Sequence, residues 1–173
     1  ATLKVVGAFH GLSRERANAR RFPSIDPLES WSRYKSFIPW EKIKTAREIL
    51  FKGNEVHQMM KVIGEEGTSI EDFTIYLKSD FLDGVYLQQN GFDEIDAATT
   101  PERQKYVFEK VVFVLETPFM FETKSEARKF FYELRHLFID WNYKKWDTEE
   151  FKNQEKEIDI FIQKHLKDEE NPQ

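Results

Sequence analysis

Residues 39–63 read PWEKIKTAREILFKGNEVHQMMKVI, and the spacing of the apolar side chains in this stretch decides the fold class. Four of them recur every three or four residues, which is the repeat of one face of an α-helix: Ile43, Ala46, Ile49 and Leu50. A second run has the same repeat: Val56, Met59, Met60 and Ile63. Pro39 suits a first helical turn and Gly64 suits a C-cap. Gly53 is expected to break or kink the helix between the two runs.

Helical patterns continue after this stretch. Ser69 offers an N-cap for a helix that carries five apolar side chains: Ile70, Phe73, Ile75, Leu77 and Phe81. Residues 83–99 contain two glycines and clustered Asn and Asp, so a long turn is expected there.

The last third of the chain predicts three more helices. Thr99 and Glu102 fit a capping box with Pro101 in the first turn, and this helix is expected to end near Glu116. The next two helices are expected at residues 125–139 and, begun by Asp147, at 148–166. Residues 31–173 are therefore predicted to form an all-α helical bundle, in which 118–173 is an extended helical tail.

The first thirty residues follow a different pattern. Residues 3–9 form a short β-branched and aromatic run that predicts one strand, and 14–20 predict a short basic helix. Residues 22–30 (FPSIDPLES) hold two prolines and are expected to be an extended loop. Because one strand cannot form a sheet, residues 1–30 are interpreted as the end of an α/β domain together with a linker.

Composition restricts the classes of function. The chain has 173 residues and a net charge of −5. It contains no cysteine, which excludes disulfides and thiolate zinc sites. No apolar run is long enough to cross a bilayer, so any membrane association is expected to be indirect. Residues 1–35 carry seven basic and three acidic side chains, while the acidic remainder argues against nucleic-acid binding.

Familiar catalytic motifs are absent from the sequence. It contains no P-loop, no GxGxxG, no HExxH and no GxSxG motif. Glu133 and His136 form one ExxH, but a di-iron site in a bundle needs a second ExxH and two more glutamates, so no metal site is predicted. The aromatic-rich stretch around residue 135 is interpreted as core, because four of its apolar residues share one helical face: Phe130, Leu134, Leu137 and Trp141.

Three places could contact a ligand or partner, although each has an ordinary structural explanation. Phe22 stands beside a proline after a basic stretch, which suits either a stacking ring or a stiff linker. Residues 88–93 (QQNGFD) offer amide donors and acceptors, close backbone approach and a ring, or are simply a polar helix end. Residues 63–72 (IGEEGTSIED) form an acidic turn between two helices, which is either a projecting contact or a solvated turn.

The order of these three places is similar to one family. GAFHGLSRERANARRFPSIDPLESWSRY, residues 7–34, resembles the junction between the nucleotide-binding domain and the C-terminal helices in catalytic subunits of rotary ATPases. FPSIDPLES resembles the FPAI-type motif of V/A-type A subunits and the YPAVDPLDS motif of ATP synthase beta subunits. IGEEGTSIED resembles the beta subunit's acidic DELSEED-type turn. QQNGFDEID, residues 88–96, resembles the A-subunit motif QQNAFDEVD and is the most specific match.

The resemblance, which covers residues 3–117, implies specific roles. Five residues would contact the adenine of ATP or ADP, with the two aromatic rings flanking the base: Phe22, Gln89, Asn90, Gly91 and Phe92. Four carboxylates would face the central stalk: Glu65, Glu66, Glu71 and Asp72. The P-loop, the Mg²⁺ ligand and the catalytic carboxylate would lie upstream of residue 1, so no catalytic residue is expected here and the chain alone is expected to be inactive.

The implied setting is a rotary motor. The full subunit would alternate with B subunits in a hexamer, contact the central stalk, and couple ATP hydrolysis or synthesis to proton or sodium transport. The implied location is cytoplasmic and peripheral to the membrane. The alternative from the residues themselves is a stand-alone helical adaptor that binds proteins through its acidic face without nucleotide.

Overall fold

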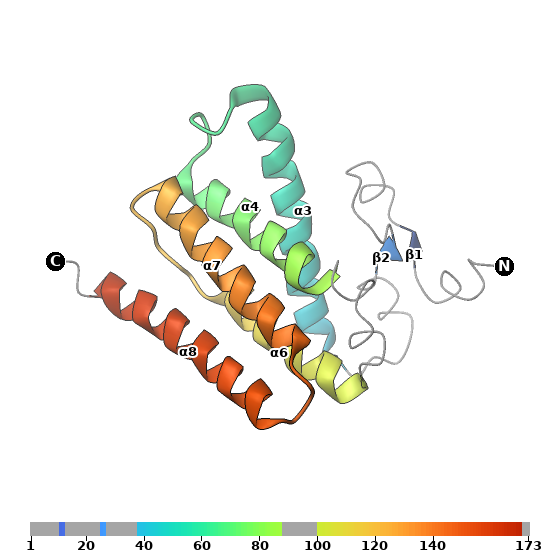
Figure 1. The fold of residues 1–173 in the computed structure, drawn as a ribbon. Helices are drawn as coiled ribbons and strands as arrows, with labels where there is room; N and C mark the ends of the chain where they lie inside the picture. Colours follow the sequence, from blue (N-terminus) through green and yellow to red (C-terminus); the bar gives the residue numbers. More distant parts are fainter. Residues whose placement is uncertain (1–10, 13–24, 27–37, 88–99, 171–173) are drawn as a thin grey trace.

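A computed structural model describes residues 11–12, 25–26, 38–87 and 100–170, and in this part the chain is a bundle of α-helices (Figure 1). The helices are α3 (Trp40–Ile63), α4 (Ile70–Leu82), α6 (Pro101–Glu116), α7 (Lys124–Tyr143) and α8 (Glu149–Glu170), with a π-helix η2 (Asp83–Leu87) directly after α4. The prediction of an all-α bundle is confirmed for this part of the chain.

Two short strands precede the bundle in sequence. β1 (Gly11–Leu12) and β2 (Ile25–Asp26) pair antiparallel, with Gly11 opposite Asp26. The strand predicted at 3–9 and the basic helix predicted at 14–20 lie outside the described residues.

α3 and α4 form a helical hairpin, and Gly53 has a different role from the one predicted. α3 runs without interruption from Trp40 to Ile63, so the expected break at Gly53 is wrong. A Cβ at position 53 would lie 2.2 Å from the Cβ of Ser79 in α4. The missing side chain therefore allows the two helices to approach closely, while the helix itself tolerates one glycine at modest cost.

α7 lies between α4 and α8 in the bundle, while α6 packs against α3 and α4 (Figure 1). The predicted apolar face of α7 is confirmed, because Phe130, Leu134 and Trp141 are buried and Leu137 is partly buried. α7 and α8 share one continuous core with the preceding helices. Its largest fully buried side chains include members from α4, α6, α7 and α8: Phe73, Phe81, Phe108, Phe138, Trp141 and Ile158.

The helix boundaries agree with the predictions in most places, but the capping residues differ at two. Ser69 accepts a hydrogen bond from the backbone N–H of Asp72, as predicted. The cap of α6 is Thr100, which accepts from the N–H of Arg103, rather than Thr99. α8 begins after Thr148, which accepts from the N–H of Phe151, whereas Asp147 has a φ of 59° and lies in the preceding turn.

The expected long turn at 83–99 begins differently from the prediction. Residues 83–87 continue the helical path as the π-helix η2, so the loop prediction is wrong for these five residues. Residues 88–99 lie outside the part that the structure describes.

Buried cationic side chains donate hydrogen bonds to carbonyls at the ends of two helices. Lys78 of α4 donates to the carbonyls of Leu115 and Thr117, at 3.0 and 2.7 Å, where α6 ends. Arg103 of α6 donates to the carbonyl of Asn142 in the last turn of α7. The last carbonyls of a helix have no intrahelical partner and carry partial negative charge, so a buried cation is well placed there.

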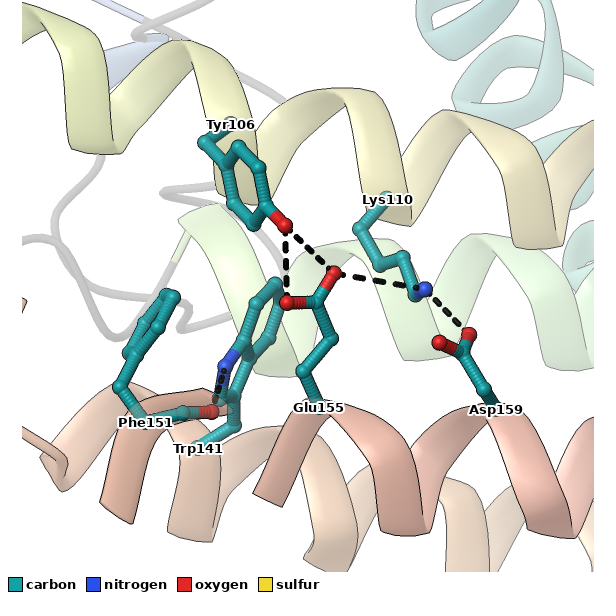
Figure 2. Close-up of polar contacts among 6 residues, drawn as sticks. All are labelled: Tyr106, Lys110, Trp141, Phe151, Glu155 and Asp159. Atoms are coloured by element: carbon teal, nitrogen blue, oxygen red, sulfur yellow. Dashed lines mark hydrogen bonds and ion pairs between the residues drawn. The ribbon is translucent and has the colours of Figure 1, made fainter. Parts of the chain in front are cut away.

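A polar seam joins α6 to α8 (Figure 2). The hydroxyl of Tyr106 lies 2.7 and 2.8 Å from the two carboxylate oxygens of Glu155, to which it donates. Lys110 forms ion pairs with Glu155 and Asp159. Partial burial, with the hydrogen bond and negative charge of Glu155 and the charge of Asp159, raises the pKa of Tyr106 to about 12. Below this seam the indole N–H of Trp141 donates to the Phe151 carbonyl at 3.1 Å.

The close approach at Gly53 gives a first prediction. Gly53→Ala should lower the free energy of unfolding by up to about 2 kcal/mol, because the overpacking cost of about 1–3 kcal/mol is offset by the roughly 1 kcal/mol that alanine gains in a helix. Urea denaturation measures the change. Adding Ser79→Gly should recover part of the loss, since it removes the atom that the new Cβ meets. A Gly53→Ala variant more stable than the parent would contradict this packing.

The buried lysine gives a prediction about pH. Desolvation lowers the pKa of Lys78 from its ordinary value of 10.5. Between the lowered pKa and 10.5 the unfolded chain binds more protons at this lysine than the folded chain, so this group's contribution to stability increases as pH rises. The unfolding free energy of the parent minus that of Lys78→Met should therefore grow as pH rises from about 7.5 toward about 10.5, and tyrosine ionisation, which both proteins share, cancels in this difference. Urea denaturation at both values measures it, and a constant or shrinking difference would contradict the prediction.

Candidate functional site

The predicted adenine contacts cannot be placed in this structure. Five residues lie outside the described part of the chain: Phe22, Gln89, Asn90, Gly91 and Phe92. The predicted stalk-facing carboxylates lie in the turn between α3 and α4, which the structure describes completely. This turn, residues 64–69 with the ends of its two helices, is the candidate functional site and is called the acidic tip below.

The backbone of the acidic tip is fixed by small residues and local hydrogen bonds. Gly64 ends α3 with a φ of 78°, a left-handed conformation that favours glycine, and its N–H donates to the Met60 carbonyl. Thr68 is buried; its N–H donates to the carbonyl of Glu65 and its hydroxyl to the carbonyl of Gly64. Ser69 then caps α4. The tip is therefore a defined turn whose shape its own sequence specifies.

Glu65 is tied to α7. Its carboxylate lies 2.5 Å from the guanidinium of Arg128, and its backbone carbonyl accepts a hydrogen bond from Lys124 at 2.6 Å. The Arg128 guanidinium also lies 5.2 Å from the ring centroid of Phe73 in α4, a cation–π contact. These three interactions join the tip to the first turns of α7, and the sequence did not indicate them because Lys124 and Arg128 lie about sixty residues away.

The other three carboxylates have different surroundings. Glu66 and Glu71 are exposed, and Asp72 is half-buried in the first turn of α4. Glu71 and Asp72 complement the partial positive charge at the start of this helix. The structure thus brings all four predicted carboxylates to one tip, with Glu65 engaged by α7 and Glu66 and Glu71 turned to solvent.

Two apolar side chains accompany the charges. Val62 is 85% exposed and Ile63 is 49% exposed, both in the last turn of α3. The helical repeat places Ile63 on one face with Val56, but only Val56 is buried, so this face does not stay in the core to the end of α3.

This arrangement suits recognition rather than bond chemistry. Exposed apolar side chains beside free carboxylates can contact a partner that offers apolar and basic groups. Residues 38–87 and 100–170 hold no cluster of three His, Asp or Glu side chains that could bind a metal ion. The two residues of the single ExxH pattern lie in α7, where Glu133 is exposed and the His136 ring packs edge-on against Tyr132. No helix in the described part is long and apolar enough to cross a membrane.

The chain resembles known proteins along most of its length. The V-type ATP synthase alpha chain of Treponema denticola is 57% identical over 155 residues, which cover 90% of this chain and 26% of that protein. The V-type ATP synthase alpha chain 1 of Treponema pallidum is 54% identical over 163 residues, covering 94% of this chain and 28% of that protein. The alpha chain of Borreliella burgdorferi strain B31 is 58% identical over 151 residues, covering 87% and 26%.

These alignments extend into the last two helices. The match of 163 residues in a chain of 173 leaves ten unaligned, so it includes all of α7 and much of α8. The chain spans about a quarter of the length of these relatives. A family described as the C-terminal domain of V and A type ATP synthase matches residues 40–126, which is half of the chain and runs from α3 to the start of α7. The chain therefore belongs to the family of C-terminal domains of V and A type ATP synthases.

Proposed function

We propose that this chain serves as the force-transmitting and nucleotide-contacting end of the catalytic alpha (A) subunit of a rotary ATPase. The full-length subunit would couple ATP hydrolysis or synthesis to transport of protons or sodium ions. It would alternate with B subunits in a hexamer at the cytoplasmic side of the membrane. Family membership and the similarity to V-type ATP synthase alpha chains support this proposal.

The observation that carries the proposal is the acidic tip. Its exposed groups project from the end of a helical hairpin, and its base is attached to α7 through Glu65. A contact of this kind can pass a displacement of the helical bundle to a partner. We assign Glu66 and Glu71 to direct electrostatic contact with the central stalk, and Val62 and Ile63 to the apolar part of the same contact. Glu65 supports the tip, and Asp72 stabilises the start of α4.

The nucleotide contacts form the second part of the proposal. Phe22 and Phe92 would stack on the two sides of the adenine ring, and Gln89, Asn90 and Gly91 would form the edge of the pocket. Stacking on an aromatic ring is worth about 1–3 kcal/mol per base in nucleic-acid complexes, so these contacts would supply affinity without chemistry. The 173 residues contain no P-loop to hold phosphates or Mg²⁺, so both would be bound by other parts of the full subunit.

The first test concerns the division of labour between binding and chemistry. The 173-residue chain alone should show no ATPase activity above background in a phosphate-release assay, because it has no phosphate-binding motif. In the full complex, Phe92→Ala should weaken binding of a fluorescent ADP analogue about five- to a hundredfold, the range that corresponds to the loss of one stacking contact. The maximal turnover rate should change much less. Unchanged nucleotide affinity would remove Phe92 from the pocket.

The second test concerns the acidic tip. Replacing both Glu66 and Glu71 by glutamine should weaken association of the A/B hexamer with the isolated central stalk about two- to thirtyfold at low salt, as expected for two exposed ion pairs of about 0.2–1 kcal/mol each. The effect should diminish in high salt because of screening. Surface-immobilised stalk and a salt series measure it. A control that neutralises two exposed glutamates of α8, Glu149 and Glu157, should leave the association unchanged. Equal loss in both variants would refute a specific role for the tip.

A further inference from the structure

The connection between α6 and α7, residues 117–123, presents one apolar side chain to solvent. Phe119 is 6% exposed and Phe121 packs against the core, whereas Met120 between them is 73% exposed. Both phenylalanine rings lie against Phe130 of α7, with ring centroids 4.8 and 5.4 Å away. Neighbouring side chains that alternate in this way point to opposite sides of the chain, as in an extended strand. The packing of its two neighbours therefore turns Met120 outward.

Two side chains of α8 hold the backbone of Met120. Its N–H donates to the Glu169 carboxylate at 2.7 Å, and its carbonyl oxygen lies 3.3 Å from Nε2 of His165. The same nitrogen lies 2.8 Å from the Glu169 carboxylate, so with a proton on Nε2 His165 donates to both oxygens. The His165 and Glu169 side chains are only 15% and 19% exposed. The His165 ring also stacks on Phe121, with centroids 4.9 Å apart.

This pair of residues, His165 and Glu169, is called the α8 clamp. It fixes the position from which the Met120 side chain extends, so a partner that covers this side chain does not need to order the connection first. The unbranched, polarisable methionine side chain can fit an irregular apolar surface. Met120 is therefore suited to contact a partner as an apolar group on a rigid base.

The position of Met120 is continuous with the acidic tip. Figure 1 shows the α3–α4 turn, the α6–α7 connection and the last turns of α8 at the same end of the bundle. Lys124, four residues after Met120, donates to the Glu65 carbonyl at 2.6 Å. Four residues span at most about 14 Å, and a standard interface buries about 800 Å² on each partner, a patch about 30 Å across. One partner can therefore cover both places.

The charges around Met120 have the same sign as those of the acidic tip. Three exposed carboxylates lie within six residues of it in the sequence: Glu116, Glu122 and Glu126. The tip exposes Glu66 and Glu71 beside its own apolar side chains. Both places thus combine apolar groups with negative charge, and both suit a partner surface that offers apolar and basic groups.

We propose that Met120 is a further apolar contact with the central stalk, and that His165 and Glu169 are positioning residues that hold it in place. This inference rests on the proposed function of the acidic tip and extends that contact to the α6–α7 connection. It also gives a role to α8, which lies beyond the stretch matched by the family of C-terminal domains.

The experiment measures association of the A/B hexamer with the surface-immobilised central stalk. Met120→Ser should weaken association about three- to thirtyfold, as expected when part of a methionine's apolar burial is lost. Met120→Leu, which keeps the apolar volume, should stay within about twofold of the parent. The loss in Met120→Ser should persist at high salt, because apolar burial is not screened, whereas the loss on neutralising the tip should shrink.

Ile160 provides a matched control. It is 67% exposed on α8, so Ile160→Ser removes an exposed apolar side chain of similar size. This variant should bind the stalk as the parent does. If Ile160→Ser weakens association as much as Met120→Ser, a specific contact at Met120 is refuted.

A double-mutant cycle tests the α8 clamp. Glu169→Ala should weaken association about two- to tenfold, the range for ordering a freed group on binding. It should add no further loss to Met120→Ser, because it acts through Met120. Glu169→Gln, which keeps an acceptor oxygen, should recover most of the loss. Additive losses of Glu169→Ala and Met120→Ser would refute the positioning role.

The variant with glutamine at both Glu66 and Glu71, measured in parallel, separates the two proposals. If it weakens association and Met120→Ser does not, the contact at Met120 fails while the function of the tip stands. If neither variant weakens association, the assignment of the tip fails, and this inference fails with it. A Met120→Ser variant that binds the stalk normally but assembles poorly with B subunits would place Met120 at a contact between subunits and refute the stalk contact.

Discussion

The bundle depends on hydrogen bonds that buried side chains donate to the carbonyls at the ends of its helices. A helix that ends inside a packed core presents carbonyls that water cannot reach, and leaving them without donors is expensive. Here side chains from other helices supply the donors: Lys78 of α4 at the end of α6, and Arg103 of α6 at the end of α7. Each cation also gains from the partial negative charge at the helix end. The order of packing is therefore specified by polar contacts as well as by the apolar core.

Much of the fold could be predicted from the sequence because it is local. The three- and four-residue repeat in residues 39–63 corresponds to one continuous helix that buries Ile43, Ala46 and Val56. The apolar face predicted at Phe130, Leu134 and Trp141 is buried as well. The cap of α6 was predicted one residue too early, at Thr99, because adjacent threonines offer the same side-chain acceptor. Gly53 shows where local reasoning fails. Its effect on the helix is weak, while its contact with Ser79 depends on a second helix that periodicity does not position.

The site was only partly predictable, because some of its contacts join residues that are far apart in the sequence. Sequence identified the carboxylates of the acidic tip, since they are consecutive or nearly so. It could not distinguish Glu65, which is bound by Arg128 and Lys124, from Glu66, which faces solvent. That distinction arises from residues about sixty positions away. The α8 clamp on Met120 was equally hidden, because His165 and Glu169 lie 45 and 49 residues after it.

The attachment of the acidic tip to α7 has a mechanical consequence. A hairpin joined only at its base behaves as a cantilever, and a lateral load on its end is absorbed by bending. The contacts of Glu65 with Arg128 and Lys124 attach the far end of this hairpin to α7, so that α7 takes up part of the load. Because the Arg128 guanidinium also packs on Phe73, this attachment engages α4 as well. Part of the tip's resistance to bending therefore depends on a surface ion pair, whose strength falls as the ionic strength of the medium rises.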